Sequence, residues 1–350
     1  MRAVRPCAGT TGGLRRAGTA RGVCFRVDHD SSERRAFSLG QPTQRAGPAR
    51  RRPPGRSLWA GGTRAVLALL LVWPMLSVAA APRALKINGS TTVNAVAAEA
   101  AEILRREKKM SITVDTQGGS SGGISGVGDR SIDIGMSSKP LTAEDRAKFP
   151  KASFAGTQIG MDAVALVVSA DVWNGGVRAL TKAQIRDIYE SKIVNWKQVG
   201  GPDRRIVFFN KEPGRGTWEV FAAWLYGDTK RAPAVRHPEV GGNEETRQKV
   251  AATRGAITQL SSSWAENHPK VKAIAIRLDD GVAAAPDRAT IASGRYPLSR
   301  PLLFITSGPP AGDAKTFIDF VRSPRGQELM RKHGYLGMSD LSTGTAKGAR

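Results

Sequence analysis

Cysteine is nearly absent from this chain. Its 350 residues include only Cys7 and Cys24, so everything after residue 24 lacks the material for a disulfide framework or a thiolate metal site. The four histidines are scattered and none stands at the spacing of a metal-ligand pair. We therefore expect no metal and no cofactor, and a hydrolase such as a phosphatase is the less favoured class of function.

Acidic residues are few relative to basic ones. The chain has 53 Lys and Arg against 30 Asp and Glu, a formal net charge of +23, and about half of that excess falls in the first 64 residues. Residues 1–55 are rich in Arg, Gly and Pro and show no hydrophobic periodicity, so we expect a disordered extension or a translation start placed too early. No basic patch interleaved with aromatic residues follows, and we expect no nucleic-acid partner.

Apolar runs of membrane-spanning length are also missing. The main run, residues 65–78, has 14 residues, whereas a spanning helix needs ~20. Basic residues precede it and Ala79, Ala80 and Ala81 follow, which is the layout of a secretory signal peptide. We expect residues 56–81 to be a signal peptide cleaved near Ala80 or Ala81, which predicts a periplasmic protein. An uncleaved membrane anchor is the alternative.

Residues 89–93 (GSTTV) lie between a short strand pattern and a helical pattern. A strand that turns straight into a helix leaves free backbone N–H groups at the helix start, and the hydroxyls of Ser90, Thr91 and Thr92 stand at the same place. Both the N–H groups and the positive end of the helix dipole favour an anion. The stretch therefore predicts an anion site, and an ordinary helix N-cap is the alternative.

The same succession of strand, hydroxyl-rich turn and helix occurs twice more. A strand pattern over residues 111–117 runs into the loop 118–123, and another over residues 132–136 runs into residues 137–140. In an open parallel sheet such turns meet at the carboxyl edge, where these folds bind ligands. The Gly-rich loop lacks the Gly-Lys-Ser/Thr ending of a nucleotide-binding loop. The candidate residues of these two turns are Ser120, Ser121, Gly122, Ser137 and Ser138.

A fourth turn, in the second half of the chain, adds positive charge. It follows the strand pattern of residues 205–210 and places cations beside a glycine and a hydroxyl. Its candidate anion-binding residues are Lys211, Arg215, Gly216 and Thr217.

Asp162 precedes a continuous apolar run, residues 163–168, that predicts a buried strand. At neutral pH phosphate keeps at least one proton, and a carboxylate can accept it, whereas fully ionised sulfate would only be repelled. Asp162 is thus a candidate for discriminating between oxyanions. A cap or turn carboxylate is the alternative interpretation.

Together these motifs resemble the periplasmic phosphate-binding proteins of high-affinity phosphate ABC transporters, in their shorter form. The resemblance covers about residues 85–338 and rests on residues 89–93, 118–124, 133–140, 293–301 and 317–326. It implies an α/β fold of the type II periplasmic binding protein class. Each of two lobes would be a mostly parallel sheet flanked by helices, with two crossover strands as the hinge. Lobe 1 would comprise residues 82–163 and 296–350, and lobe 2 residues 164–295.

The resemblance also implies a function. The protein would be a monomer that captures inorganic phosphate between its lobes and delivers it to an inner-membrane ABC permease, without catalysis. The family usually has arginine where Lys211 stands and Gly-Ser-Gly-Thr-Arg at residues 214–218. Arg215 could then supply the bidentate contact, while Trp218 packs into a helix. A binding protein for sulfate or molybdate, or a phosphate sensor without transport, are the alternatives.

Overall fold

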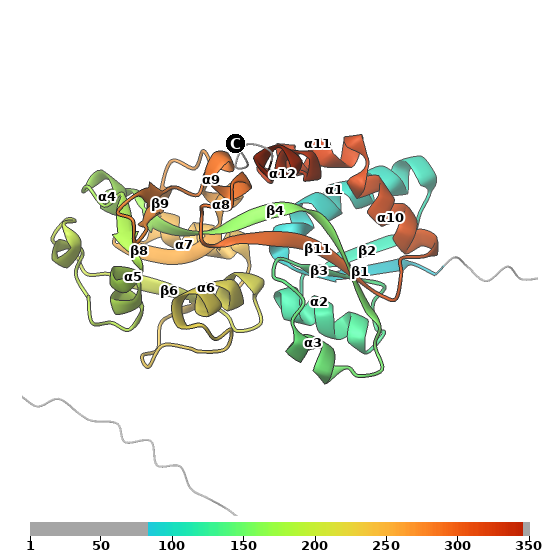
Figure 1. The fold of residues 1–350 in the computed structure, drawn as a ribbon, viewed down its shortest axis with the longest axis horizontal. Helices are drawn as coiled ribbons and strands as arrows, with labels where there is room; N and C mark the ends of the chain where they lie inside the picture. The colour runs from blue at the N-terminus through green and yellow to red at the C-terminus, as the bar shows by residue number, and fades with distance from the viewer. Residues whose placement is uncertain (1–82, 346–350) are drawn as a thin grey trace, which may run out of the picture. The chain divides into compact units, whose positions relative to one another are not determined.

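The computed structural model describes residues 83–345 (Figure 1). The predicted extension (1–55) and signal peptide (56–81) lie outside these residues. The first elements are β1 (Leu85–Gly89), α1 (Thr91–Lys108), β2 (Ile112–Asp115), α2 (Gly119–Gly128), β3 (Ile134–Ser137), α3 (Ala143–Lys148) and β4 (Phe154–Ser169). The next are α4 (Ala170–Asn174), β5 (Ala179–Thr181), α5 (Lys182–Tyr189), the short 3₁₀ helix η1 (Trp196–Val199), β6 (Val207–Lys211), α6 (Gly216–Tyr226), β7 (Glu239–Val240) and α7 (Asn243–Ala252). The last are β8 (Ala256–Ser261), α8 (Ser262–Ala265), β9 (Val271–Arg277), β10 (Ala283–Ala284), α9 (Arg288–Ala292), β11 (Ser299–Ser307), α10 (Gly312–Arg322), α11 (Pro324–Lys332) and α12 (Met338–Thr345).

The long strands β4 and β11 run side by side between two groups of elements (Figure 1). In lobe 1, β1 pairs in parallel with β2 and β3, and β11 closes this sheet by antiparallel pairing with β3 and β4. In lobe 2, β6 pairs in parallel with β7 and β8, while β4 pairs antiparallel with β8 and β9. This is the two-lobed α/β architecture that the sequence predicts, although the crossover strands make the sheet mixed.

The crossover strand β4 changes partners in mid-course. Its residues up to Ala163 pair with β11, and from Val164 onward it pairs with β8. The change falls where we place the boundary between the lobes, and the boundaries themselves remain a prediction.

Each lobe buries its own apolar core. In lobe 1, α1 covers β1 and β3 with the apolar face that includes Val93, Ala97 and Leu104. In lobe 2, the core surrounds Tyr189 and Phe221. Trp218 of α6 is buried there as expected, and its indole N–H donates to the Tyr189 hydroxyl (3.2 Å).

The Gly-rich run after β2 differs from the expected loop, because it forms the first turns of α2 rather than preceding a helix. Close packing explains the glycines. A Cβ on Gly123 would lie 2.8 Å from the Asn88 carbonyl oxygen and 2.9 Å from that of Met136, so glycine lets α2 lie directly on β1 and β3.

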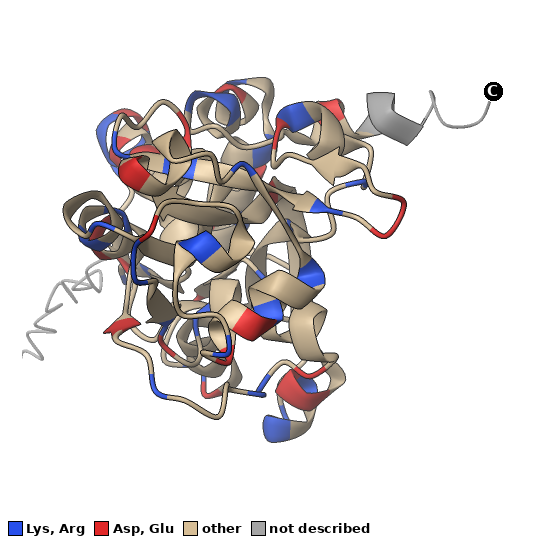
Figure 2. Ribbon diagram, turned by 90° about the vertical axis from the view of Figure 1, so that its left-hand side faces the viewer, with Lys and Arg blue, Asp and Glu red and all other residues tan. Residues whose placement is uncertain are grey.

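Residues 83–345 include no helix long and apolar enough to cross a membrane. Lys and Arg are interspersed with Asp and Glu along the elements of the view in Figure 2.

Candidate functional site

The starts of α1, α2 and α6 converge on one small cavity between the lobes. It has ≈ 10 Å³ of free space, and hydrogen bonds join the two lobes around it, so the lobes are closed. The lining residues come from both lobes and from five separate turns. They are Ser90, Thr91, Thr92, Gly119, Ser120, Ser138, Lys211, Arg215, Gly216, Thr217, Gly241 and Asn243.

Three serine hydroxyls of lobe 1 form a connected chain along this cavity. Ser90 donates to the hydroxyl of Ser138 (2.9 Å), and the backbone N–H of Ser138 donates to the hydroxyl of Ser120 (3.1 Å). Ser90 also caps α1 by accepting from the N–H of Thr92 (3.2 Å). Hydroxyls rotate freely, so a guest anion could take the place of a neighbouring hydroxyl as acceptor.

Lobe 2 brings the first turn of α6 directly onto these serines. A Cβ on Gly216 would lie 2.5 Å from the Ser120 hydroxyl oxygen and 2.8 Å from that of Ser138. Glycine leaves the serine hydroxyls in place at this approach, which brings the positive end of the α6 dipole to the cavity.

Arg300 of β11 is a site residue that the sequence analysis missed. Its guanidinium is buried, and it donates to the hydroxyl oxygens of Thr217 (2.9 Å) and Thr92 (3.2 Å), one from each lobe. The result is a permanent positive charge directly behind the cavity. Arg300 lies in a segment quoted for the family resemblance, but a single arginine in a strand gave no signal of its role.

Asp162 lies beside Arg300 and not on the cavity lining where we expected it. Its Oδ2 accepts from Nε (3.1 Å) and Nη2 (2.8 Å) of Arg300, and its Oδ1 accepts from the Ser262 hydroxyl (3.1 Å). Both oxygens are engaged, the side chain is fully buried, and it does not line the cavity. Asp162 thus lies where the counterion of a buried arginine is required, and its part in discriminating between oxyanions stays a prediction.

The two predicted cations line the cavity, but their charged groups bind the protein itself. The Lys211 ammonium donates to the carbonyl oxygens of Gly241 (2.9 Å) and Gly242 (3.1 Å) and to the Thr246 hydroxyl, and so fixes the loop before α7. Burial lowers the pKa of Lys211 well below its ordinary value, and the charges of Arg215 and Arg300 lower it further.

Arg215 does not present the bidentate contact to the cavity that we expected. Its Nε (3.1 Å) and Nη2 (2.8 Å) both donate to Oε2 of Glu212, three residues earlier. Two of the three guanidinium nitrogens are therefore bound to this nearby carboxylate and do not contact a guest.

Three further predicted residues, Ser121, Gly122 and Ser137, do not line the cavity. The Ser121 hydroxyl donates to Glu219, and the Ser137 hydroxyl donates to the Lys139 carbonyl oxygen. Neighbouring positions in a helix or strand point in different directions, so a run of hydroxyls cannot all face one guest.

Asn243, at the start of α7, was not predicted. Its amide donates to the Thr92 hydroxyl oxygen (3.0 Å) across the lobes. The sequence gave no signal for it, because nothing in its own segment distinguishes this asparagine from others.

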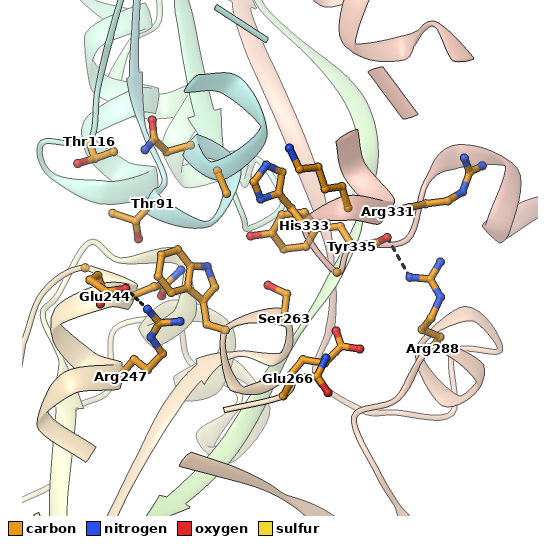
Figure 3. Close-up of a pocket in the computed structure, with 18 residues that line it drawn as sticks. Thr91, Thr116, Glu244, Arg247, Ser263, Glu266, Arg288, Arg331, His333 and Tyr335 are labelled. Atoms are coloured by element: carbon orange, nitrogen blue, oxygen red, sulfur yellow. Dashed lines mark hydrogen bonds and ion pairs between the residues drawn. The ribbon is translucent and has the colours of Figure 1, made fainter. Parts of the chain in front are cut away.

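A larger pocket of ≈ 840 Å³ adjoins the small cavity and shares Thr91 and Asn243 with it. Residues of both lobes surround it (Figure 3). Arg247 pairs with Glu244, and Arg288 donates to the Tyr335 carbonyl oxygen.

No group of three His, Cys, Asp or Glu side chains within the described residues is placed to hold a metal ion.

Comparison with known proteins places the chain in a family. Residues 77–325 match the model of the PBP superfamily domain. The phosphate-binding protein PstS of Borreliella burgdorferi is 30% identical over 261 residues, which is 72% of this chain and 89% of that protein. PstS of Bacillus subtilis is 28% identical over 73% of this chain and 81% of its own length.

Two solved structures share the fold. One is a phosphate ABC transporter substrate-binding protein from Clostridium perfringens with bound phosphate, at 29% identity and a TM-score of 0.64 over 73% of this chain and all of that one. The other is an ABC-type phosphate transport receptor from Vibrio cholerae, at 28% identity and a TM-score of 0.57 over 72% of this chain and 99% of that one. The chain therefore belongs to the PBP superfamily, within the family of the PstS phosphate-binding proteins.

Proposed function

We propose that this protein captures inorganic phosphate between its two lobes and delivers it to an inner-membrane ABC permease. One observation carries the proposal: three helix starts and hydroxyls from both lobes converge on one cavity, and the Arg300 guanidinium binds two of these hydroxyls from behind. The names of its PstS relatives and the phosphate bound to the Clostridium perfringens protein support the choice of guest.

The cavity has the means to offset the cost of burying an anion, which is of order tens of kcal/mol for an isolated charge in a dry medium. Backbone N–H groups at helix starts and charge-assisted hydrogen bonds are the interactions that compensate such a charge. Phosphate would take over hydrogen bonds that the hydroxyls now give one another. We propose as its ligands Ser90, Thr91, Thr92, Ser120, Ser138, Gly216 and Thr217, with Arg300 as the positive charge behind them.

The cell biology of the protein belongs to the same proposal. The chain would be exported after cleavage of its signal peptide, act as a monomer in the periplasm, and release phosphate to the permease when the lobes part. Capture and release need no reaction of the ligand, so we propose a binding protein rather than an enzyme.

A second candidate, a binding protein for a fully ionised oxyanion such as sulfate or molybdate, is favoured by one observation. The cavity lining contains no carboxylate, because Asp162 lies behind Arg300. Without a negative group facing the guest, sulfate would not be strongly repelled.

Tryptophan fluorescence distinguishes the two candidates, since Trp218 follows Thr217 directly. Phosphate, arsenate, sulfate and molybdate are titrated separately at pH 7. We expect saturable responses to phosphate and arsenate, and weaker responses to sulfate and molybdate. Sulfate or molybdate binding as tight as that of phosphate would favour the second candidate.

A further inference from the structure

Glu219, on α6 of lobe 2, is held entirely by groups of lobe 1. Its Oε2 lies 2.7 Å from the Lys139 ammonium, and its Oε1 accepts from the Ser121 hydroxyl (2.6 Å). Only 5% of the Lys139 side chain and 11% of the Glu219 side chain are exposed. The contact between the lobes thus includes a buried ion pair (Lys139–Glu219), and breaking such a pair is costly when one charge stays buried.

The cation of this pair is already fixed within lobe 1. The Lys139 ammonium also donates to both oxygens of Asp145 (3.1 and 2.9 Å). Burial raises the pKa of Asp145, but hydrogen bonds from Lys139 and Thr142 outweigh it and hold the pKa below its ordinary value. When the lobes part, Lys139 keeps Asp145, whereas Glu219 loses both of its partners.

The pair lies close to the cavity without lining it. Glu219 is in the first turn of α6, three residues after Gly216, which lies against Ser120 and Ser138. α6 and α2 face each other across the lobes (Figure 1). Holding Glu219 therefore holds the start of α6 against the serines of lobe 1.

We propose that Lys139 and Glu219 are positioning residues that form their ion pair only when the lobes close, and that this pair sets how long the captured anion is retained. The inference rests on the proposed function. An interaction made only in the closed state slows the release of the anion and does not speed its entry.

The chain offers a matched control in a second ion pair between the lobes. Lys230 of lobe 2 contacts Glu144 of lobe 1, but 57% and 49% of these side chains are exposed. Exposed ion pairs contribute little because water and salt screen them. Lys230→Met should therefore leave phosphate release unchanged.

Stopped-flow fluorescence measures phosphate association and dissociation in each variant. For Glu219→Gln we expect dissociation about tenfold faster at an association rate that is unchanged or higher, since Lys139 keeps Asp145 and more of the ligand-free protein is open. For Lys139→Met we expect about 100-fold faster dissociation, because Glu219 and Asp145 are then buried together without a cation. Adding Glu219→Gln to Lys139→Met should recover part of that loss. A slower association rate with unchanged dissociation would instead assign Lys139 a role in attracting the anion and overturn the proposal.

A second measurement needs no phosphate. Spin labels at Lys148→Cys and Asp228→Cys, in a Cys7→Ser and Cys24→Ser background, report the distance between the lobes. We expect Glu219→Gln to shift the ligand-free distribution to longer distances, and Lys230→Met to leave it unchanged. If the wild type does not bind phosphate but Glu219→Gln still lengthens the distance between the spin labels, the proposed function is wrong. The role of the ion pair in holding the lobes together is then still supported. If phosphate binds and Glu219→Gln behaves like Lys230→Met in both measurements, the ion-pair proposal is wrong.

Discussion

Arg300→Met is expected to abolish phosphate binding and to lower the free energy of unfolding by about 3–5 kcal/mol. The substitution removes the buried cation and the donors to Thr92 and Thr217. It also leaves the Asp162 carboxylate buried without its counterion. Isothermal titration with phosphate measures the first effect, and urea unfolding measures the second.

Two companion variants separate these effects. Arg300→Met combined with Asp162→Asn removes both charges, so stability should largely return while phosphate binding stays absent. Arg300→Lys keeps a positive charge but cannot contact Asp162 and both threonines at once, and we expect weak binding. Phosphate affinity of Arg300→Met within tenfold of the wild type would show that the cation behind the cavity is not required.

The parts of the site that could be predicted are those with a local signature. Ser90 and Thr217 stand where a helix begins, and a strand or loop that runs into a helix is visible in a short window of sequence. The convergence of such turns follows from the rule that ligands bind at the carboxyl edge of parallel strands. The two-lobed fold was predicted from the resemblance to the periplasmic phosphate-binding proteins, which rests on local motifs of this kind.

The parts that were missed depend on contacts between distant segments. The sequence around Asp162 shows no partner for its carboxylate. Its partner, Arg300, lies 138 residues later and is brought beside it by the pairing of the two crossover strands. Asn243 reaches Thr92 only because the lobes close. The misplaced expectation for Arg215 is different, because Glu212 lies three residues earlier and could have been weighed as its partner.

Gly216→Ala is expected to weaken phosphate binding by about 100-fold and to leave stability unchanged or slightly higher. Alanine has a higher helix propensity than glycine, so the substitution should stabilise α6 itself. Its methyl group, however, would lie 2.5 Å from the Ser120 hydroxyl oxygen when the lobes are closed. The lobes must then stay apart or Ser120 and Ser138 must turn away from the guest, and overpacking of this kind costs about 1–3 kcal/mol.

The effect of Gly216→Ala should be confined to the closed state, which makes it separable from a folding defect. Gly156→Ala in β4 is the matched control, because a Cβ there meets nothing within 4 Å. Thermal unfolding without phosphate should give Gly216→Ala the stability of the wild type, and added phosphate should raise the unfolding temperature of Gly156→Ala but hardly that of Gly216→Ala. Equal stabilisation of both variants by phosphate would mean that the anion does not bind between the start of α6 and the serines of lobe 1, and that the guest site lies elsewhere.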